Sequence, residues 1–393
     1  MVTDTGSATG RTFMRRRERP VSPADDGSRS EWWWDVRSAF LGWLLARALV
    51  AGGAIMAYAS VERLLGDTNL PSLRDGLLSW DAAFYRDIAT VGYGGLPEEA
   101  LRFYPLHPIF ARAFDFILPG GIDVALVVVA NIFALLAGAM FHRLVRREFD
   151  IYVAGRAVWM FSLFPSAFVL VFGYSEPLML FGLIGAFDAA RREKWWQAAI
   201  FGLIAGASRP LGLALVLPMA IEAARTVRTA DWRDRVGRLA AIAAPAVSTL
   251  AYLAYVEARF GDGLSPLRMQ SQFRGDFVDP VTRIFRGIGD LMGSEALGDG
   301  LHIPFALVFV GLLVVVAVRL PASYTVFTAS LLFVSLNADN LNSLERYGLN
   351  AFPLIIALAL VSRDPRVERV ILTSSGAMLA MLTALSLLGA YVP

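Results

Sequence analysis

Long apolar runs alternate with short polar and basic stretches along most of the chain. A helix needs about 20 apolar residues to cross a bilayer, and most of these runs approach that length. The pattern therefore predicts an all-α polytopic integral membrane protein with about 9–11 membrane segments. The apolar runs are residues 37–60, 122–141, 151–171, 177–190, 196–221, 239–257, 303–319, 323–337, 348–361 and 370–391.

The composition supports this class. Hydrophobic residues make up 56% of the 393 residues and charged residues 18%, with a mean hydropathy of +0.54, whereas about a quarter of a typical soluble domain is charged. Such a chain leaves no room for a separate soluble catalytic domain. It has no cysteine and three histidines, which excludes disulfides and thiolate metal sites and argues against a histidine-rich one. We expect no cofactor.

The first 35 residues form a polar and basic segment. They have little apolar surface to bury, so the sequence predicts a disordered tail, followed by one membrane domain over residues 36–393. Arg15 to Arg19 are interpreted as a cytoplasmic anchor rather than a nucleic-acid-binding patch. Trp32 to Trp34 are expected at the membrane interface, at the start of the first span.

Basic loops predict the topology. Positive loops remain on the cytoplasmic side of a membrane, which places the N-terminus inside and makes residues 61–121 and 258–302 the first and second outer loops. Lys194 is the only lysine among 36 basic residues. We take this preference for arginine as a sign of a bacterial genome rich in GC, and hence of a bacterial plasma membrane. The basic loops are residues 143–147, 191–194, 225–238 and 363–369.

Residues 196–221 do not fit a simple count of spans. They connect two basic loops, so the chain must leave the cytoplasmic side and return within a run too short for two full helices. Pro210 removes a backbone donor near the middle of this run, and a broken, re-entrant pair of helices is expected there. Broken backbone at membrane depth must line protein or a watery cavity. Arg209 is therefore predicted to face a cavity.

This topology brings several polar side chains to the outer face. Ionisable groups at the edge of a membrane are functional candidates by default. A carboxylate at Asp81 is suited to accept a proton from a hydroxyl group, and Arg209 and Arg346 are suited to hold a phosphate. This set suits glycosyl transfer from a lipid phosphate. The candidate residues are Trp80, Asp81, Arg86, Tyr104, His107, Glu176, Arg209 and Arg346.

The motifs that carry these residues resemble a known family. WDAAFYRDIATVGY, FYPLHPIFAR, LFPSAFVLVFGYSEPLML, GASRPLG and ERYGLNAFPLIIALAL follow one another in that order. Together they resemble the PIG-V-like mannosyltransferases, enzymes of the GT-C fold related to the second mannosyltransferase of GPI-anchor synthesis. The resemblance extends over about residues 37–361.

The resemblance implies a polyprenyl-phosphate mannose donor, inversion at the sugar carbon to give an α-mannoside, and Asp81 as the catalytic base. A bacterial member would use a glycolipid, a glycan or a protein as acceptor instead of a GPI precursor. His107 stands where many relatives have an aromatic residue, and the pair Arg209-Pro210 replaces a turn often written with Ser or Asn.

Each candidate also has a structural interpretation. Trp80 and Asp81 fit an interfacial aromatic residue and a helix N-cap, and Glu176 fits a helix-start carboxylate favoured by the macrodipole. Arg346 could pair with Glu345 or with lipid headgroups. Structural roles fit the rest as well: a solvated helix face for Arg86, loop packing for His107 and an interfacial ring for Tyr104.

Alternative functions also remain open. Nothing in the motifs identifies the configuration of the sugar, so a GT-C enzyme that transfers arabinose or glucose fits them too. A lipid-linked glycan flippase or transporter is the alternative from another class. Transporters usually contain inverted repeats and ionisable groups near the bilayer midplane, whereas the polar groups here gather at one face. A metal between Asp81 and Glu176 is possible, but no pattern in the sequence supports it.

Overall fold

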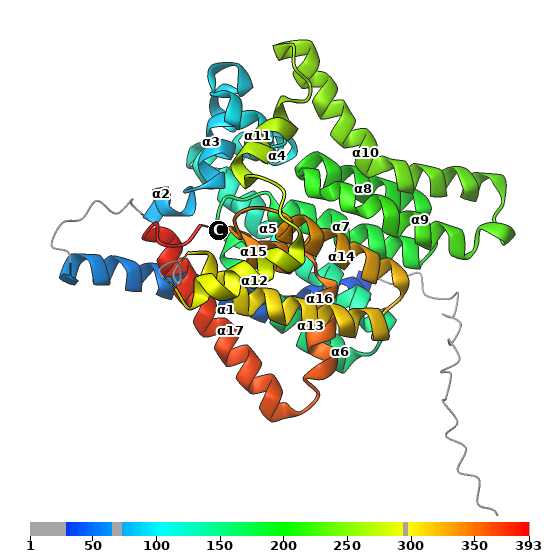
Figure 1. Ribbon diagram of the computed structural model, residues 1–393. Coiled ribbons are helices and arrows are strands. Elements are labelled where there is room, and N and C mark those ends of the chain that lie inside the picture. The colour runs from blue at the N-terminus through cyan, green and yellow to red at the C-terminus, as the bar shows by residue number, and fades with distance from the viewer. Residues whose placement is uncertain (1–28, 65–72, 294–297, 393) are drawn as a thin grey trace, which may run out of the picture.

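The computed structural model describes residues 29–64, 73–293 and 298–392, which form an all-helical bundle (Figure 1). Within these ranges the β-type pairing is a single bridge between Phe277 and Ala338. Five described helices are long and apolar enough to cross a membrane, and this confirms an all-helical membrane protein. These helices are α1 (Arg29–Leu64), α5 (Gly121–Glu148), α10 (Trp232–Phe260), α13 (Ile303–Arg319) and α17 (Pro365–Leu387).

The other predicted runs form shorter helices. α15 and α16 are bent by 82° at a short break, and together they pass the same test for a span, which raises the count to six among the described residues. This count is below the expected 9–11 because turns interrupt several runs before a full span is complete. The shorter helices are α6 (Ile151–Ser162), α7 (Glu176–Arg191), α8 (Trp195–Ser208), α9 (Val216–Arg225), α14 (Ala322–Leu336), α15 (Leu344–Asn350) and α16 (Pro353–Val361).

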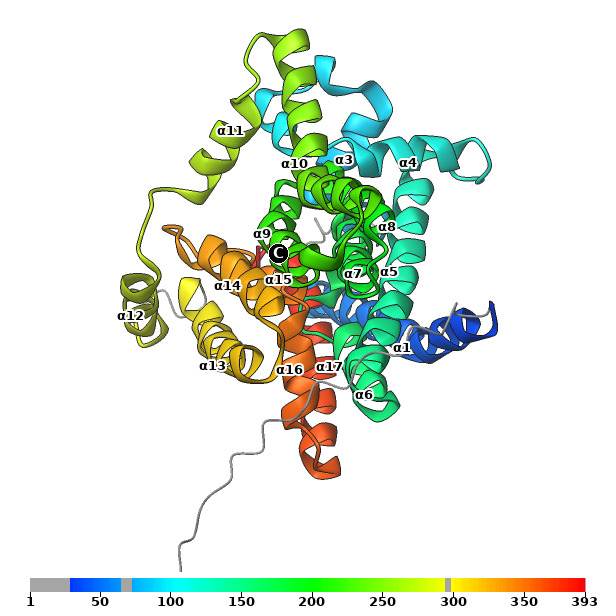
Figure 2. The same ribbon diagram turned by 90° about the vertical axis from the view of Figure 1, so that its right-hand side faces the viewer.

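Short helices fill the two predicted outer loops. α3, α4 and α11 lie together on one side of the molecule, beside the C-terminal part of α10 (Figures 1 and 2). The helices of the first loop are α2 (Leu73–Leu77), α3 (Asp81–Val91), η1 (Tyr93–Gly95), η2 (Glu98–Arg102) and α4 (Leu106–Asp115). Those of the second are α11 (Ser265–Arg274), α12 (Pro280–Leu291) and η6 (Asp299–His302). The remaining 3-10 helices are η3 (Ala167–Leu170), η4 (Pro210–Leu215) and η5 (Val227–Thr229).

Helix α7 forms the centre of the bundle and is buried along almost its whole length. Small residues let α8 approach it closely. A Cβ atom on Gly182 would lie 2.7 Å from the backbone nitrogen of Ala205. Between membrane helices, packing of this kind replaces the hydrophobic driving force that lipid removes. Helix α7 is thereby packed closely against α8, with Glu176 at its start.

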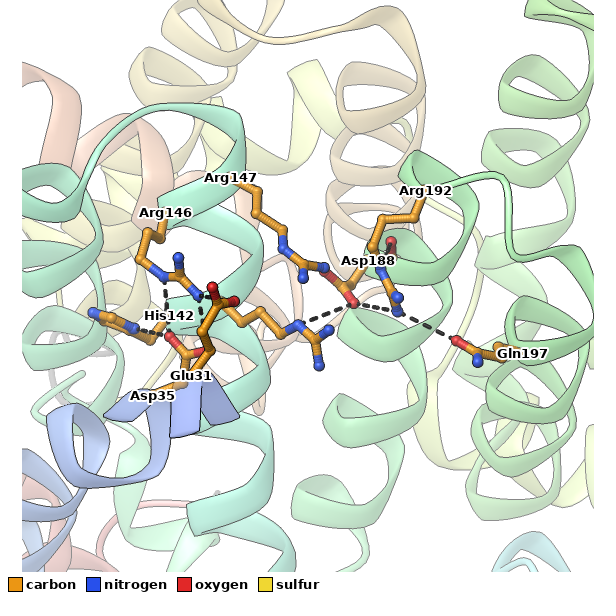
Figure 3. A network of polar contacts seen from close by, with 9 residues as sticks. Glu31, Asp35, His142, Arg146, Arg147, Asp188, Arg192 and Gln197 are labelled. Carbon is orange, nitrogen blue, oxygen red and sulfur yellow. Dashed lines mark hydrogen bonds and ion pairs between the residues drawn. The ribbon is translucent and has the colours of Figure 1, made fainter. Parts of the chain in front are cut away.

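A network of ion pairs lies at the other end of α7 (Figure 3). Asp188 lies 2.8 Å from Arg192 and 3.2 Å from Arg147, counted between the closest oxygen and nitrogen atoms. Nearby, Asp35 accepts hydrogen bonds from Arg146 and lies 2.6 Å from His142 Nδ1. Two of the basic loops recognised in the sequence thus gather at one end of α7, opposite Glu176.

The break expected within residues 196–221 is present. Helix α8 ends at Ser208, Arg209 has extended backbone angles of φ −160° and ψ 154°, and the chain continues as η4 from Pro210. The chain then packs directly on the end of α8, because a Cβ atom on Gly212 would lie 2.4 Å from the carbonyl carbon of Ala205.

Helix α1 begins at Arg29, inside the segment expected to be disordered, which covered residues 1–35. Trp32 packs against buried residues of the bundle, and this contact accounts for the earlier start. Trp33 is exposed, as expected of an interfacial ring. Arg15 to Arg19 lie outside the described residues.

Candidate functional site

Four of the predicted residues meet in one cluster. Asp81 comes from the start of α3, Glu176 from the start of α7, Arg209 from the break after α8 and Arg346 from α15. One Asp81 oxygen accepts hydrogen bonds from Arg346 at 2.7 Å and from Arg209 at 3.1 Å. Glu176 is hydrogen-bonded to Arg209 and lies 3.3 Å from Arg346. Two carboxylates and two guanidinium groups therefore form a closed ion-pair network.

The backbone on both sides of this cluster is strained. Trp80 has φ +57° and Ser343 has φ +68°, a region that residues other than glycine seldom adopt. Trp80 directly precedes Asp81, and the Ser343 hydroxyl accepts a hydrogen bond of 3.1 Å from Arg346. Strain of this kind persists where surrounding structure over-determines it, and it concentrates at functional sites.

The cluster is only partly open to solvent. The exposed fraction of the side chain is 16% for Asp81, 15% for Arg209, 10% for Arg346 and zero for Glu176. Burial raises the pKa of the Asp81 carboxyl group, but Arg346 and Arg209 outweigh burial and lower the pKa to about 2. Asp81 is therefore an ionised carboxylate whose charge two cations already balance.

A cavity of about 430 Å³ opens onto this cluster. Arginines and Asp81 line one end of it, and the other end is apolar. Leu213, Leu217 and Val334 line the apolar end and are also exposed at the surface of the bundle. The cavity therefore joins a charged end to an apolar surface, which suits an amphiphile with an anionic head. Its apolar lining comes from η4, α9 and α14 and includes Leu211, Leu213, Ala214, Leu217, Leu331 and Val334.

A second cavity, of about 550 Å³, reaches Asp81 from another side. Its lining includes the aromatic rings of Trp80 and Phe84 together with the polar side chains of Glu99 and Gln272. Asp81 thus lies where two cavities meet, and Arg102 and Arg346 also line both of them. This position allows it to contact two ligands at once.

The other predicted residues have different positions. Trp80 lines the second cavity and donates a hydrogen bond from Nε1 to the carbonyl oxygen of Ser386. Arg86 lies near the surface, 3.4 Å from Asp87, and is not part of either cavity lining. This position resembles the solvated helix face considered from the sequence.

His107 and Tyr104 are buried and are not part of either cavity lining. His107 Nε2 lies 3.1 Å from the carbonyl oxygen of Gly173, and burial lowers the pKa of its ring to about 4. The ring is therefore neutral. Tyr104 packs against Tyr252 with ring centroids 4.5 Å apart. In this structure both side chains stabilise the first loop.

Sequence reasoning missed several lining residues of the site. Arg102 and Phe273 line both cavities, and Arg274 lines the first. Arg274 donates a hydrogen bond to the Tyr347 hydroxyl, which joins α11 to α15. The available signal for Arg102 was its position between motifs already singled out, beside the aromatic residue Phe103.

The carboxylates in this cluster are held by arginines. Across the described ranges, no group of three or more Asp, Glu or His side chains has an arrangement that could hold a metal ion.

A family model described as Mannosyltransferase (PIG-V) matches residues 60–224. Over these residues the chain is similar to the PIG-V mannosyltransferases. This PIG-V segment contains Asp81, Glu176 and Arg209, and Arg346 joins the cluster from beyond it. The resemblance stated from the motifs is confirmed over this segment.

No curated protein matches the chain. Among solved structures, the chain is similar to the crystal structure of ArnT from Cupriavidus metallidurans bound to undecaprenyl phosphate, with 14% identity and a TM-score of 0.49. The match covers 83% of this chain and 62% of ArnT, so the chain spans less than two thirds of that protein.

Proposed function

We propose that the protein is an inverting membrane mannosyltransferase that moves mannose from a polyprenyl-phosphate mannose donor to a lipid, glycan or protein acceptor. The observation that carries this proposal is the position of Asp81, which lies between two cavities and is paired with two arginines. The match of residues 60–224 to the PIG-V mannosyltransferase model supports the reaction class.

The first cavity is suited to the donor. A polyprenyl chain is apolar and its phosphate is anionic, and this cavity has an apolar wall that leads to Arg209 and Arg346. The donor is a phosphodiester with one negative charge, and its departing phosphate monoester gains a second charge as the bond to the sugar breaks. Guanidinium groups at the charged end of the cavity stabilise this growing charge.

The second cavity is suited to the acceptor. Asp81 takes the proton of an acceptor hydroxyl group, whose oxygen forms a bond to the anomeric carbon of mannose. The bond between that carbon and the phosphate oxygen breaks, and its electron pair leaves with the polyprenyl phosphate. Because the acceptor attacks opposite to the leaving group, a β-linked mannose becomes an α-mannoside.

The ion pairs of the site link donor binding to the strength of the base. A carboxylate with a pKa of about 2 has a low affinity for a proton, so Asp81 is a weak base while both arginines hold it. When Arg209 and Arg346 turn toward a donor phosphate, Asp81 loses its counter-charge beside a new negative group. The proton affinity of Asp81 therefore rises once the donor is bound. This is the stage at which the acceptor hydroxyl group must lose its proton.

We place this reaction on the extracytoplasmic face of a bacterial plasma membrane. The arginine-rich loops at the far end of α7 support this orientation, since positive loops favour the cytoplasmic side.

The test is transfer of radiolabelled mannose from synthetic polyprenyl-phosphate mannose to extracted membrane acceptors by the purified protein. We expect the wild-type protein to transfer label to a new product. The Asp81→Asn variant measures the background and should give no labelled product. Donors that carry glucose or arabinose on the same lipid test the sugar. Faster transfer from one of these than from the mannose donor would overturn the mannose assignment, and movement of lipid between leaflets without a new glycosidic bond would favour a flippase.

A further inference from the structure

Arg102, the last residue of η2, has no direct ion-pair partner among the described residues. Within the described part of the chain, Arg102 makes no hydrogen bond and no ion pair, and its buried Nε atom has no partner. The side chain as a whole is half-buried, and a buried N–H group such as this one normally has a partner, because loss of its hydration is costly. By contrast, Arg209 and Arg346 are bonded to carboxylates in the same cluster.

Aromatic rings fix the position of this guanidinium group. Its central carbon lies 4.2 Å from the ring centroid of Phe273, 4.8 Å from that of Phe103 and 5.7 Å from that of Phe84. Stacking on aromatic faces stabilises the cation but uses none of its N–H donors. The Nη groups of Arg102 are therefore held in place without a partner among the described residues, whereas Nε is buried.

Arg102 lines both cavities beside Asp81. The described cluster contains the positive charges of Arg102, Arg209 and Arg346 and the negative charges of Asp81 and Glu176. These five groups carry one excess positive charge, and Glu99, which also lines the second cavity, forms no ion pair with Arg102 among the described residues. Burial lowers the pKa of Arg102, Asp81 raises it, and the two other arginines lower it further.

We propose that Arg102 binds the phosphate group of the lipid donor and retains it after the sugar has left. This inference rests on the proposed function and adds a binding residue to it. Arg102 is suited to receive the phosphate first, because it has no carboxylate to release, whereas Arg209 and Arg346 must exchange theirs. A stacked, planar guanidinium group can donate two parallel hydrogen bonds to phosphate oxygens.

Binding of two lipids to the full-length protein tests the proposal: undecaprenyl phosphate and undecaprenol, which has the same chain without the phosphate. The readout is the dissociation constant of undecaprenol divided by that of undecaprenyl phosphate. A higher ratio means a stronger preference for the phosphate. We expect Arg102→Gln to weaken binding of undecaprenyl phosphate by about tenfold to a hundredfold and to leave undecaprenol binding unchanged, as loss of a charge-assisted hydrogen bond predicts. Arg286→Gln, on α12 and outside both cavity linings, is the matched control and should leave the ratio unchanged.

Arg102→Lys is the second variant, and it decides the question if Arg102→Gln fails to fold. It keeps the charge but loses the paired donors, so the ratio should fall several-fold. An unchanged ratio in a folded variant, or equal weakening of both lipids, would overturn the proposal and assign Arg102 a packing role. If the wild-type protein does not prefer the phosphate, the proposal is also wrong. Absence of mannosyl transfer with an altered binding ratio would contradict the proposed function alone.

Discussion

Arg346 donates a hydrogen bond of 2.7 Å from Nη1 to the carboxylate of Asp81, across 265 residues of sequence. The same oxygen also accepts a bond from Arg209. A carboxylate held in this way is charged but weakly basic, and cations held in this way are not free to bind another anion. In the mechanism that we propose, these groups exchange partners when a donor phosphate enters, so that donor binding and proton transfer are linked.

This exchange predicts a difference between two pH profiles. The profile of kcat/KM reports the free enzyme and that of kcat reports the substrate complex. In the free enzyme the pKa of Asp81 is lowered to about 2, so kcat/KM should not fall on the acid side until the pH approaches that value. In the complex the arginines contact phosphate and the pKa rises, so kcat should fall at a higher pH. Coincident acid limbs in the two profiles would contradict the exchange.

The same ion pairs predict an acid dependence of stability. Arginines lower the pKa of Asp81 in the folded protein below its ordinary value of 3.8. This stabilisation is complete above the ordinary value and is lost as the pH falls from there toward about 2. The free energy of unfolding in detergent should decrease over this window, and less so for Asp81→Asn. An equal decrease in both proteins would show that other groups cause it.

Glu176→Gln should destabilise the protein strongly. The Glu176 side chain is fully buried and paired with Arg209 and Arg346, so its neutralisation leaves buried positive charge without compensation, at a cost of about 3–5 kcal/mol. Chemical denaturation in detergent measures this cost. Asp87→Asn is the control, because its partly exposed pair with Arg86 should contribute less than about 1 kcal/mol. Equal effects of the two changes would refute the structural role of Glu176.

Gly212→Ala should disturb the position of Arg209. The added methyl group would lie 2.4 Å from the Ala205 backbone and must push η4 away from α8, which we expect to cost about 1–3 kcal/mol of stability. KM for the donor should rise, because Arg209 begins the displaced segment. Gly155→Ala is the matched control, since a Cβ atom there meets nothing within 4 Å. If Gly212→Ala leaves KM for the donor at the wild-type value, the close packing does not position Arg209.

Much of this structure follows from the sequence alone. Apolar runs predict the helices, and Pro210 inside a short run predicts the break at Arg209. The candidate cluster was within reach as well, because the basic loops predict that Asp81, Glu176 and Arg346 lie on one face of the membrane.

The finer structure was not accessible from the sequence. Arg102 and Arg86 are both arginines of the first loop, and only tertiary packing places Arg102 among aromatic rings and Arg86 at the surface. His107 belongs to a motif that predicts a functional site, yet its ring is hydrogen-bonded to the carbonyl group of Gly173. Periodicity assigns a residue to one face of a helix but does not identify what packs against that face. The position of α11 beside the first cavity, for example, depends on tertiary contacts such as the hydrogen bond between Arg274 and Tyr347.

The rate of mannosyl transfer by Asp81→Asn, measured together with its binding of undecaprenyl phosphate, tests the central claim most directly. Loss of a general base slows a reaction by about 10²–10⁴-fold, and removal of the carboxylate charge releases Arg209 and Arg346 for the phosphate. We therefore expect transfer to fall by at least about a hundredfold while the lipid binds as tightly as to the wild-type protein, or more tightly. Transfer at the wild-type rate would contradict the account.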